Sequence, residues 1–125
     1  ERTILENLPG CEFHVMGTGF TWETQDSDKD REAAEKVWSQ CEHLFKDPEI
    51  KLIVLDELTY MLNYKYLDKQ KVIQAIENRP KDQNVIITGR GAKKYLTDIA
   101  DTVSEVKAVK HAFNNGIKAQ KGIEW

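Results

Sequence analysis

The spacing of apolar residues changes along the chain, and each spacing predicts a different element of secondary structure. Between Ser27 and Asp47 the apolar residues recur at steps of three and four, which is typical of an amphipathic helix of roughly five turns. This stripe comprises Ala34, Val37, Trp38, Cys41, Leu44 and Phe45. The helix should end at Asp47, because the proline that follows disfavours helical geometry in the residue before it.

Two continuous apolar runs, residues 52–55 and 84–88, are rich in β-branched residues. A strand that is covered on both faces has this pattern, which favours a parallel sheet. Between the two runs, Asp68 is placed to cap a second helix that ends before Pro80. The apolar face of this helix comprises Val72, Ile73 and Ile76.

Three weaker patterns complete the order of elements. Alternating residues predict a short strand at 12–16 and a strand with one wetter face at 102–106. Residues 114–116, Asn-Asn-Gly, predict a turn and leave a hairpin open as an alternative. A short helix should carry Tyr95, Leu96 and Ile99. Strands and helices would then alternate along the chain, which predicts an α/β layer fold with a mostly parallel sheet and flanking helices.

Length and composition agree with one soluble domain. The chain has 125 residues, of which 40% are hydrophobic and 31% are charged. This length is enough for a single domain with a real core, so we expect residues 1–125 to form one α/β domain. No apolar run approaches the ~20 residues that a membrane span needs. Because the sequence begins with Glu1 and not with Met, we expect it to be part of a longer protein.

The charge is unevenly distributed. The net charge is −3, but residues 1–78 hold 9 basic and 16 acidic side chains, whereas residues 79–125 hold 9 basic and 5 acidic. The basic second part suits a ligand that carries phosphate. It is not dense enough to indicate nucleic-acid binding. Cys11 and Cys41 and the three histidines lack the spacing of a zinc site, so we expect reduced thiols.

Polar residues follow the two predicted inner strands, where ligands of α/β sheets bind. Asp56 and Glu57 follow the first strand and could hold Mg²⁺, although strands also end in polar residues at ordinary surfaces. Thr88-Gly-Arg-Gly91 lies at the end of the second strand and suits phosphate, or forms a plain turn. No phosphate loop of the form GxxxxGK[ST] occurs in the sequence.

Two large aromatic residues, Phe20 and Trp22, follow the glycines at positions 17 and 19. On such a loop they could stack on a large planar ligand. The pattern alone favours the alternative that both side chains belong to the core.

Five motifs, taken together and in this order, resemble the P-loop type of ATP:corrinoid adenosyltransferase, also called cob(I)alamin adenosyltransferase. They are Gly-Thr-Gly-Phe-Thr-Trp-Glu-Thr (17–24), Val-Leu-Asp-Glu-Leu-Thr-Tyr (54–60), Val-Ile-Ile-Thr-Gly-Arg-Gly (85–91), Ala-Asp-Thr-Val-Ser-Glu (100–105) and Val-Lys-His-Ala-Phe with Gly-Ile-Lys-Ala-Gln-Lys-Gly-Ile-Glu (109–124). Each motif alone would be weak. Because the five cover nearly the whole chain, the resemblance is specific.

The resemblance implies a P-loop NTPase fold of the RecA-like type, here without its first strand and phosphate loop. Residues 1–125 would be the C-terminal part of that domain. The first strand of the family lies inside the sheet, between strands that this chain contains. We therefore expect two apolar strand edges to be unpaired, unless another segment or chain fills the gap or the sheet reorganises.

The resemblance also implies a reaction. Cobalt of a corrinoid, reduced to Co(I), attacks C5′ of the ribose of ATP, and triphosphate is released. The cofactor supplies the reactivity, and the protein supplies position and electrostatics. Without the phosphate loop, we expect this chain alone to bind MgATP poorly and to be inactive.

Residue roles follow from the same resemblance. Phe20 and Trp22 would contact the lower axial face of the corrinoid and keep a base from coordinating cobalt. Asp56 and Glu57 would be the Mg²⁺–triphosphate carboxylates, with Glu57 as the catalytic residue. The residues expected near the nucleotide are Thr88, Arg90, Lys110 and His111.

The implied enzyme is a cytoplasmic homodimer of cobalamin biosynthesis or salvage. It would use ATP, Mg²⁺ and a corrinoid, with a reductase as electron donor, and would bind neither nucleic acid nor a membrane. Two alternatives stay open. One is a non-catalytic corrinoid-binding or subunit-interaction module. The other is a P-loop ATPase that hydrolyses ATP, against which Phe20 and Trp22 argue.

Overall fold

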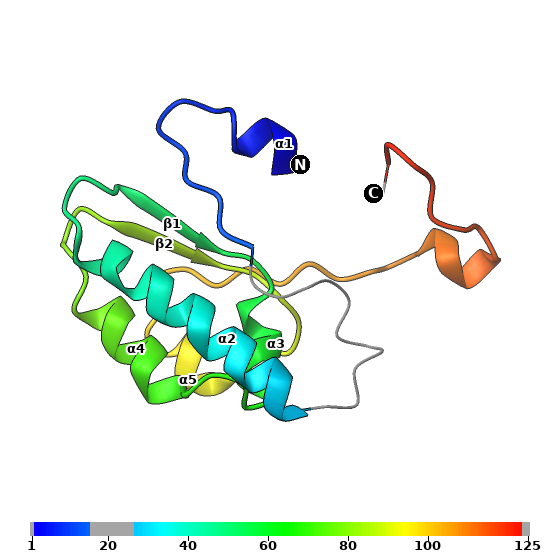
Figure 1. Ribbon diagram of the computed structural model, residues 1–125. Helices are drawn as coiled ribbons and strands as arrows, with labels where there is room; N and C mark the ends of the chain where they lie inside the picture. Colours follow the sequence, from blue (N-terminus) through cyan, green and yellow to red (C-terminus); the bar gives the residue numbers. More distant parts are fainter. Residues whose placement is uncertain (1, 16–26, 124–125) are drawn as a thin grey trace.

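The computed structural model describes residues 2–15 and 27–123 of the chain (Figure 1). The two strands β1 and β2 pair in parallel and form a small sheet. In Figure 1 the helices α2, α3, α4 and α5 lie below this sheet. The described part is therefore an α/β structure with a small parallel sheet, which agrees with the predicted fold class. The helices and strands are α1 (Arg2–Leu5), α2 (Ser27–Cys41), η1 (Glu42–Lys46), β1 (Leu52–Leu55), α3 (Leu58–Asn63), α4 (Lys69–Glu77), β2 (Asn84–Ile87), α5 (Lys94–Thr97) and η2 (Ala112–Asn115).

The predicted helices form with small differences. The first continues past Cys41 as the 3₁₀-helix η1 and not as one α-helix. Asp68 caps α4 as predicted, because its carboxylate accepts a hydrogen bond from the Gln70 amide at 2.8 Å. Helix α3 was not predicted from the sequence. It has only six residues, which is too short for a helical repeat to stand out, and its apolar residues come soon after the apolar run of β1.

The core lies between the sheet and the helices. Trp38 of α2 and Phe45 of η1 pack with their ring centroids 5.6 Å apart. The core comprises Ala34, Trp38, Leu44, Phe45, Ile53, Leu58, Leu62, Leu67, Val72, Ile76 and Leu96. Each of these residues comes from the apolar stripe of a helix, from a strand or from a connecting loop, so the core joins segments that are far apart in the sequence.

A buried glutamine holds the turn before β1 against the start of β2. The Gln83 side-chain nitrogen donates to the carbonyls of Leu44 at 2.9 Å, Asp47 at 3.2 Å and Ile50 at 3.0 Å. These carbonyls belong to the end of η1 and to the turn that follows. Gln83 therefore ties three backbone carbonyls of this turn to the start of β2, two of which, those of Leu44 and Asp47, also accept from backbone amides within the turn.

The sheet is covered on one face only, so the expectation that both faces are covered was wrong for the described chain. In β1, Ile53 is buried, whereas Leu52 and Val54 are exposed. The register places Val54 beside Ile86, which is also exposed. Side chains alternate between the two faces of a strand, and the helices lie against only one of these faces.

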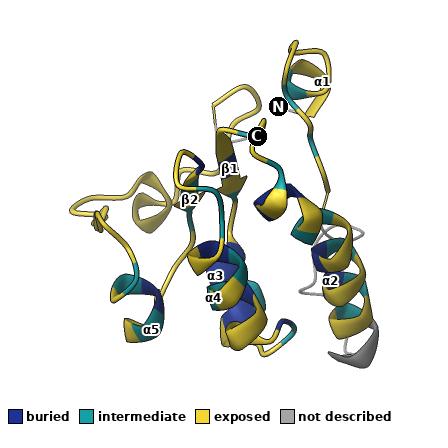
Figure 2. Ribbon diagram, turned by 90° about the vertical axis from the view of Figure 1, so that its left-hand side faces the viewer, coloured by how far each residue is buried: buried dark blue, intermediate teal, exposed yellow. Residues whose placement is uncertain are grey.

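Two predicted strands do not form in the described chain. Residues 12–15 and 102–106 have no strand partner, and residues 102–106 are exposed (Figure 2). Alternation shows that a segment can form a strand, but its backbone needs a neighbouring strand to pair with. The predicted turn at residues 114–116 is confirmed as the end of η2, with Gly116 at φ +76°. It does not close a hairpin.

Within residues 2–15 and 27–123, no helix combines the length and the apolar character that crossing a membrane would require.

Candidate functional site

The polar residues that follow β1 and β2 meet at one edge of the sheet. The register pairs Leu55 with Ile87, so Asp56 lies beside Thr88. The Thr88 hydroxyl donates to Asp56 Oδ1 at 2.6 Å and accepts from the Glu57 amide at 2.9 Å. One hydroxyl therefore bonds both acidic residues, a contact that the sequence analysis did not predict. We refer to Asp56, Glu57 and Thr88 as the strand-end site.

Glu57 turns the chain sharply from β1 into α3. Its backbone is left-handed, with φ 55° and ψ 22°, and it stands just before the first residue of α3. A left-handed conformation is uncommon for a residue other than glycine, and it clusters at functional sites. The side chains of Asp56 and Glu57 are both exposed, so their carboxylates are open to a ligand.

The turn from Gly89 to Gly91 rests directly on α3. Gly89 has φ +134°, and a Cβ atom at this position would overlap with the Thr59 hydroxyl. One helical turn further, the Asn63 side-chain nitrogen donates to the carbonyls of Arg90 at 3.3 Å and Gly91 at 3.2 Å. Helix α3 thus fixes the backbone of Arg90, whose side chain is exposed.

The sequence analysis did not identify Thr59 and Asn63 as supports of this turn. Thr59 is buried, and its hydroxyl has no hydrogen-bond partner among the described residues. The sequence did contain a signal for this role: Thr59 and Asn63 stand four residues apart, shortly after Asp56 and Glu57. In a helix, this spacing places Thr59 and Asn63 on one face. That signal required α3 to be recognised first.

The donor set of the strand-end site fits Mg²⁺. Among the described residues, no group of three or more His, Cys, Asp or Glu side chains is arranged to hold a metal ion. Mg²⁺ in nucleotide sites needs only one or two carboxylates, because water and substrate phosphates supply its other ligands. Asp56 and Glu57 are two adjacent exposed carboxylates of this kind, and Thr88 holds one oxygen of Asp56 in place.

The remaining predicted site residues lie elsewhere. Lys110 and His111 are exposed on the segment after α5, and the described structure does not bring them to the strand-end site. His111 Nδ1 accepts from the Phe113 amide at 3.2 Å and so caps η2. Phe20 and Trp22 lie outside the described residues.

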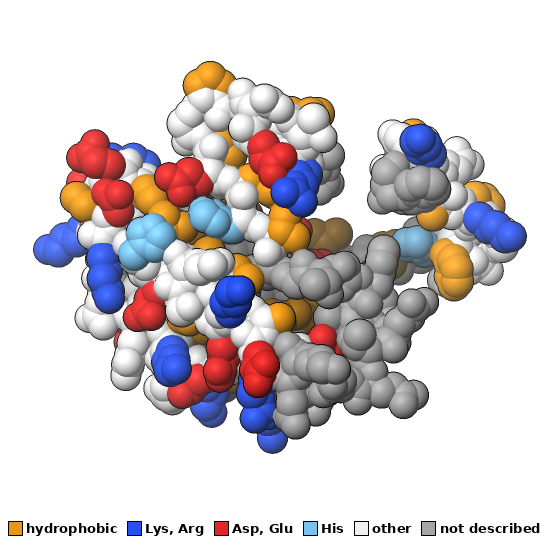
Figure 3. All heavy atoms as spheres, viewed as in Figure 1, with side chains coloured by type: hydrophobic (Ala, Val, Ile, Leu, Met, Phe, Trp, Pro, Cys, Tyr) orange, Lys and Arg blue, Asp and Glu red, His pale blue; other side chains and the backbone are white. Residues whose placement is uncertain are grey.

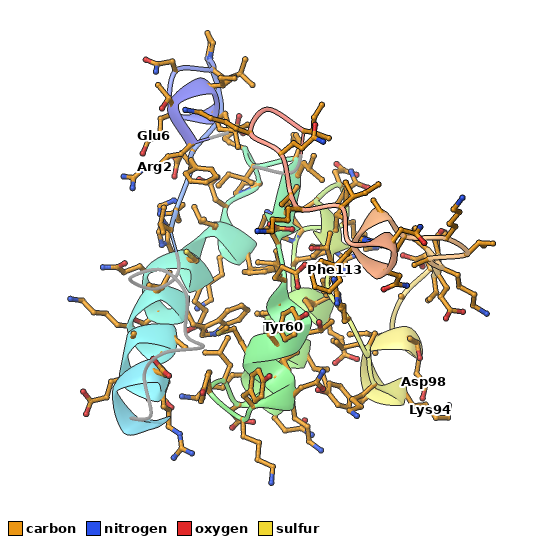
Figure 4. The ribbon with its side chains drawn as sticks, turned by 90° about the vertical axis from the view of Figure 1, so that its right-hand side faces the viewer. Arg2, Glu6, Tyr60, Lys94, Asp98 and Phe113 are labelled. Carbon is orange, nitrogen blue, oxygen red and sulfur yellow. The ribbon has the colours of Figure 1, made fainter. Side chains whose placement is uncertain are left out.

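A stack of three tyrosines, which the sequence analysis missed, begins at Tyr60 within α3 (labelled in Figure 4) and continues past the end of the helix. The ring centroids of Tyr60 and Tyr64 are 6.3 Å apart, and those of Tyr64 and Tyr66 are 5.7 Å apart. The Tyr66 hydroxyl donates to Asp30 Oδ2 at 3.5 Å. Burial and this neighbouring carboxylate raise the pKa of Tyr66. The stack links α3 to the start of α2.

Known proteins are similar in sequence to this chain over all or most of its length. The chain is 52% identical over 125 residues to corrinoid adenosyltransferase CobA of Salmonella typhimurium. These aligned residues are 100% of this chain and 63% of that protein. The chain is 49% identical over 125 residues to corrinoid adenosyltransferase of Escherichia coli K12, with the same coverage. The enzyme of Pseudomonas aeruginosa is 50% identical over 113 residues, which are 90% of this chain and 56% of that protein.

The chain thus spans less than two thirds of the length of these relatives. The family model described as ATP:corrinoid adenosyltransferase BtuR/CobO/CobP matches residues 1–125. This match includes the acidic strand end of β1, the Thr88–Gly91 turn and the segment after α5. Because this match extends over residues 1–125 and the relatives are about 50% identical, the chain belongs to the ATP:corrinoid adenosyltransferase family BtuR/CobO/CobP.

Proposed function

We propose that the whole protein transfers the 5′-deoxyadenosyl group of ATP to the cobalt of a Co(I) corrinoid and releases triphosphate. Co(I) donates an electron pair to C5′ and becomes Co(III), while the C5′–O bond breaks and its electron pair leaves with the triphosphate. The family and its relatives are named for ATP and corrinoid adenosyl transfer, which supports this choice of substrates. This chain alone, without the phosphate loop, would be inactive.

One observation carries the proposal. Thr88 accepts a hydrogen bond from the Glu57 amide and donates one to the Asp56 carboxylate, at the sheet edge where nucleotide ligands of α/β folds bind. A site that stabilises charge on a leaving triphosphate must hold its groups in place before the reaction begins. Thr88 gives the strand-end site this fixed geometry.

In this proposal, Asp56 and Glu57 would hold Mg²⁺, which neutralises charge on the triphosphate when it is bound. Arg90 would contact phosphate oxygens, since a guanidinium can donate two parallel hydrogen bonds to them. Thr88, Lys110 and His111 would lie near the nucleotide once the segment after α5 packs in the whole protein. Phe20 and Trp22 would cover the lower axial face of the corrinoid.

We extend the proposal to the fold of the whole protein. The phosphate-loop strand of the family would pair with the free edge of β2, and residues 102–106 would then form a strand on its other side. This arrangement is of the P-loop NTPase type, and residues 1–125 would be the C-terminal part of one domain. The whole protein would be a cytoplasmic homodimer that receives electrons from a reductase.

A second candidate is a subunit-interaction or corrinoid-binding module without catalysis. The observation that favours it is the exposure of large apolar side chains on the sheet face and after α5, which suits contact with further polypeptide. The two candidates differ in their dependence on the strand-end site, because only the enzyme needs its carboxylates.

The test compares two Thr→Val variants of the full-length protein. Thr88→Val removes the hydroxyl that orients Asp56, whereas Thr97→Val removes a hydroxyl that only donates to the Lys94 carbonyl at 3.0 Å in α5. We expect Thr88→Val to lower the rate of adenosylcorrinoid formation roughly 10–100-fold at limiting Mg²⁺ and to raise the Mg²⁺ concentration needed for half-maximal rate. Thr97→Val should leave both values unchanged. Equal rates for the two variants across a magnesium titration would reject the proposed role.

A further inference from the structure

A cleft of about 550 Å³ opens on the side of the molecule formed by α2, the α3–α4 loop and the residues before and within α5. Its charged walls comprise Arg31, Glu35, Lys65, Asp68, Lys69 and Lys93. None of the residues of the strand-end site lines this cleft, and Arg90 does not line it either. The cleft therefore has a lining of its own, although it adjoins the site proposed for ATP and Mg²⁺ at Asn63, whose side chain donates to the carbonyls of Arg90 and Gly91.

The lining of the cleft has four basic and two acidic side chains, which leaves a net charge of +2. None of its four basic side chains lies within 4.0 Å of a carboxylate of the described residues. Lys94, next to Lys93 but outside the cleft, shows the contrast, because it pairs with Asp98 at 2.6 Å. Of the two acids in the cleft, Asp68 caps α4, and its carboxylate offsets part of the positive charge there. Basic groups that converge on a concave surface concentrate an attractive potential for anions.

One of the ammonium groups is held in position. Lys69 Nζ lies 5.4 Å from the centroid of the half-buried Tyr95 ring, a cation–π arrangement. Lys69 is also the first residue of the nine-residue helix α4, whose N-terminus carries partial positive charge. Leu62, Leu67 and Tyr95 add apolar surface to the same walls.

We propose that this cleft binds a phosphorylated organic molecule. The phosphate would lie between Lys69 and Lys93, and the organic part would lie against Leu62, Leu67 and Tyr95. Several converging cations match a dianionic group with three acceptor oxygens better than they match a single carboxylate. The volume exceeds what a bare phosphate ion needs and falls in the range of about 300–1,000 Å³ that is typical of small-molecule sites. The proposal does not depend on the adenosyl-transfer function.

The experiment uses full-length protein and follows backbone amide shifts by NMR during titration with ribose 5-phosphate, with ribose and inorganic phosphate as separate probes. We expect ribose 5-phosphate to shift the amides of residues 65–70 and 93–95, and ribose to shift neither segment. Inorganic phosphate should shift the same amides more weakly, because it lacks the organic part. Raising the salt concentration should weaken binding of both phosphates.

Matched variants locate the binding. Lys69→Gln with Lys93→Gln should weaken ribose 5-phosphate binding at least tenfold, whereas Lys81→Gln with Lys118→Gln, which changes the net charge equally outside the cleft, should change it less than twofold. Tyr95→Leu should weaken binding several-fold while keeping the apolar wall. These side chains are exposed or half-buried, and unchanged melting temperatures would verify that each variant is folded.

Three results would overturn the proposal: no shift at residues 65–70, equal weakening by the two lysine pairs, or shifts confined to residues 88–91. The Arg90→Gln variant separates this proposal from the proposed function. It should impair adenosyl transfer and leave the cleft shifts unchanged, so failure of one proposal does not imply failure of the other.

Discussion

Residues of the same type have opposite environments in the two halves of this molecule. In the packed part, Val72 is 0% exposed and Phe45 is 2% exposed, whereas after α5 Val106 is 97% exposed and Phe113 is 74% exposed. We call residues 100–123 the C-terminal arm; it is exposed throughout, and its later part with η2 lies away from the sheet in Figure 1. Figure 3 shows hydrophobic and basic side chains together on its surface.

The difference shows that a hydrophobic pattern needs a partner to become structure. The stripe of α2 repeats every three to four residues and meets the apolar faces of β1 and α4 within the same chain. The arm has alternating and isolated apolar residues, but no strand of the described chain pairs with it. Its apolar residues therefore contribute little to the stability of this chain.

The sharpest test of this comparison truncates one phenylalanine in each region. Phe45→Ala removes a buried ring beside Trp38 and leaves a cavity, so we expect a loss of about 3–5 kcal/mol in the free energy of unfolding. Phe113→Ala should change it by less than about 0.5 kcal/mol, as exposed substitutions usually do. Urea unfolding of both variants measures the difference. Similar losses would mean that the arm packs against the protein.

The same comparison repeated in the full-length protein sharpens it. If residues 100–123 pack there, as proposed, Phe113→Ala should become destabilising while the effect of Phe45→Ala stays large. An unchanged, near-zero effect of Phe113→Ala would show that this ring stays exposed in the whole protein.

A second comparison substitutes one glycine in each region. Gly89→Ala meets both a strained backbone and overlap with Thr59, so we expect a loss of roughly 2–5 kcal/mol. Gly116→Ala has φ +76° but no atom within 4 Å of the added Cβ, so only the backbone strain of roughly 1–2 kcal/mol applies. Thermal melting checks both variants. The contrast fails if Gly116→Ala proves the more costly change.

The smallest effects are expected from exposed ion pairs. Lys94 and Asp98 pair at 2.6 Å on α5, and Lys107 and Glu105 pair at 3.2 Å on the arm (Figure 4 labels the first pair). Asp98→Asn should lower stability by less than about 0.5 kcal/mol, because a lysine four residues before an acid is the weaker order on a helix. Glu105→Gln should have no measurable effect. Melting at low and high salt tests both, and a loss above about 1 kcal/mol from either change would contradict this view.

The sequence by itself determined the elements whose signal is local. Helix periodicity predicted α2 and α4, the apolar runs predicted β1 and β2 as parallel strands, and Asp68 was identified as a cap. The positions of Asp56, Glu57 and Thr88 at strand ends followed from the same runs, and five motifs in order indicated the family. Each of these inferences depends on residues within one turn or one strand of each other, or on direct comparison of sequences.

The tertiary structure decided what depends on contacts between distant segments. It placed the Thr88 hydroxyl on both Asp56 and Glu57, 32 and 31 residues away in the sequence, and it set Gly89 against Thr59. It also left residues 102–106 unpaired and one face of the sheet open. No periodicity encodes such pairings, because a strand or a turn acquires its partner only when the chain folds and backbone groups from separate segments come within hydrogen-bonding distance.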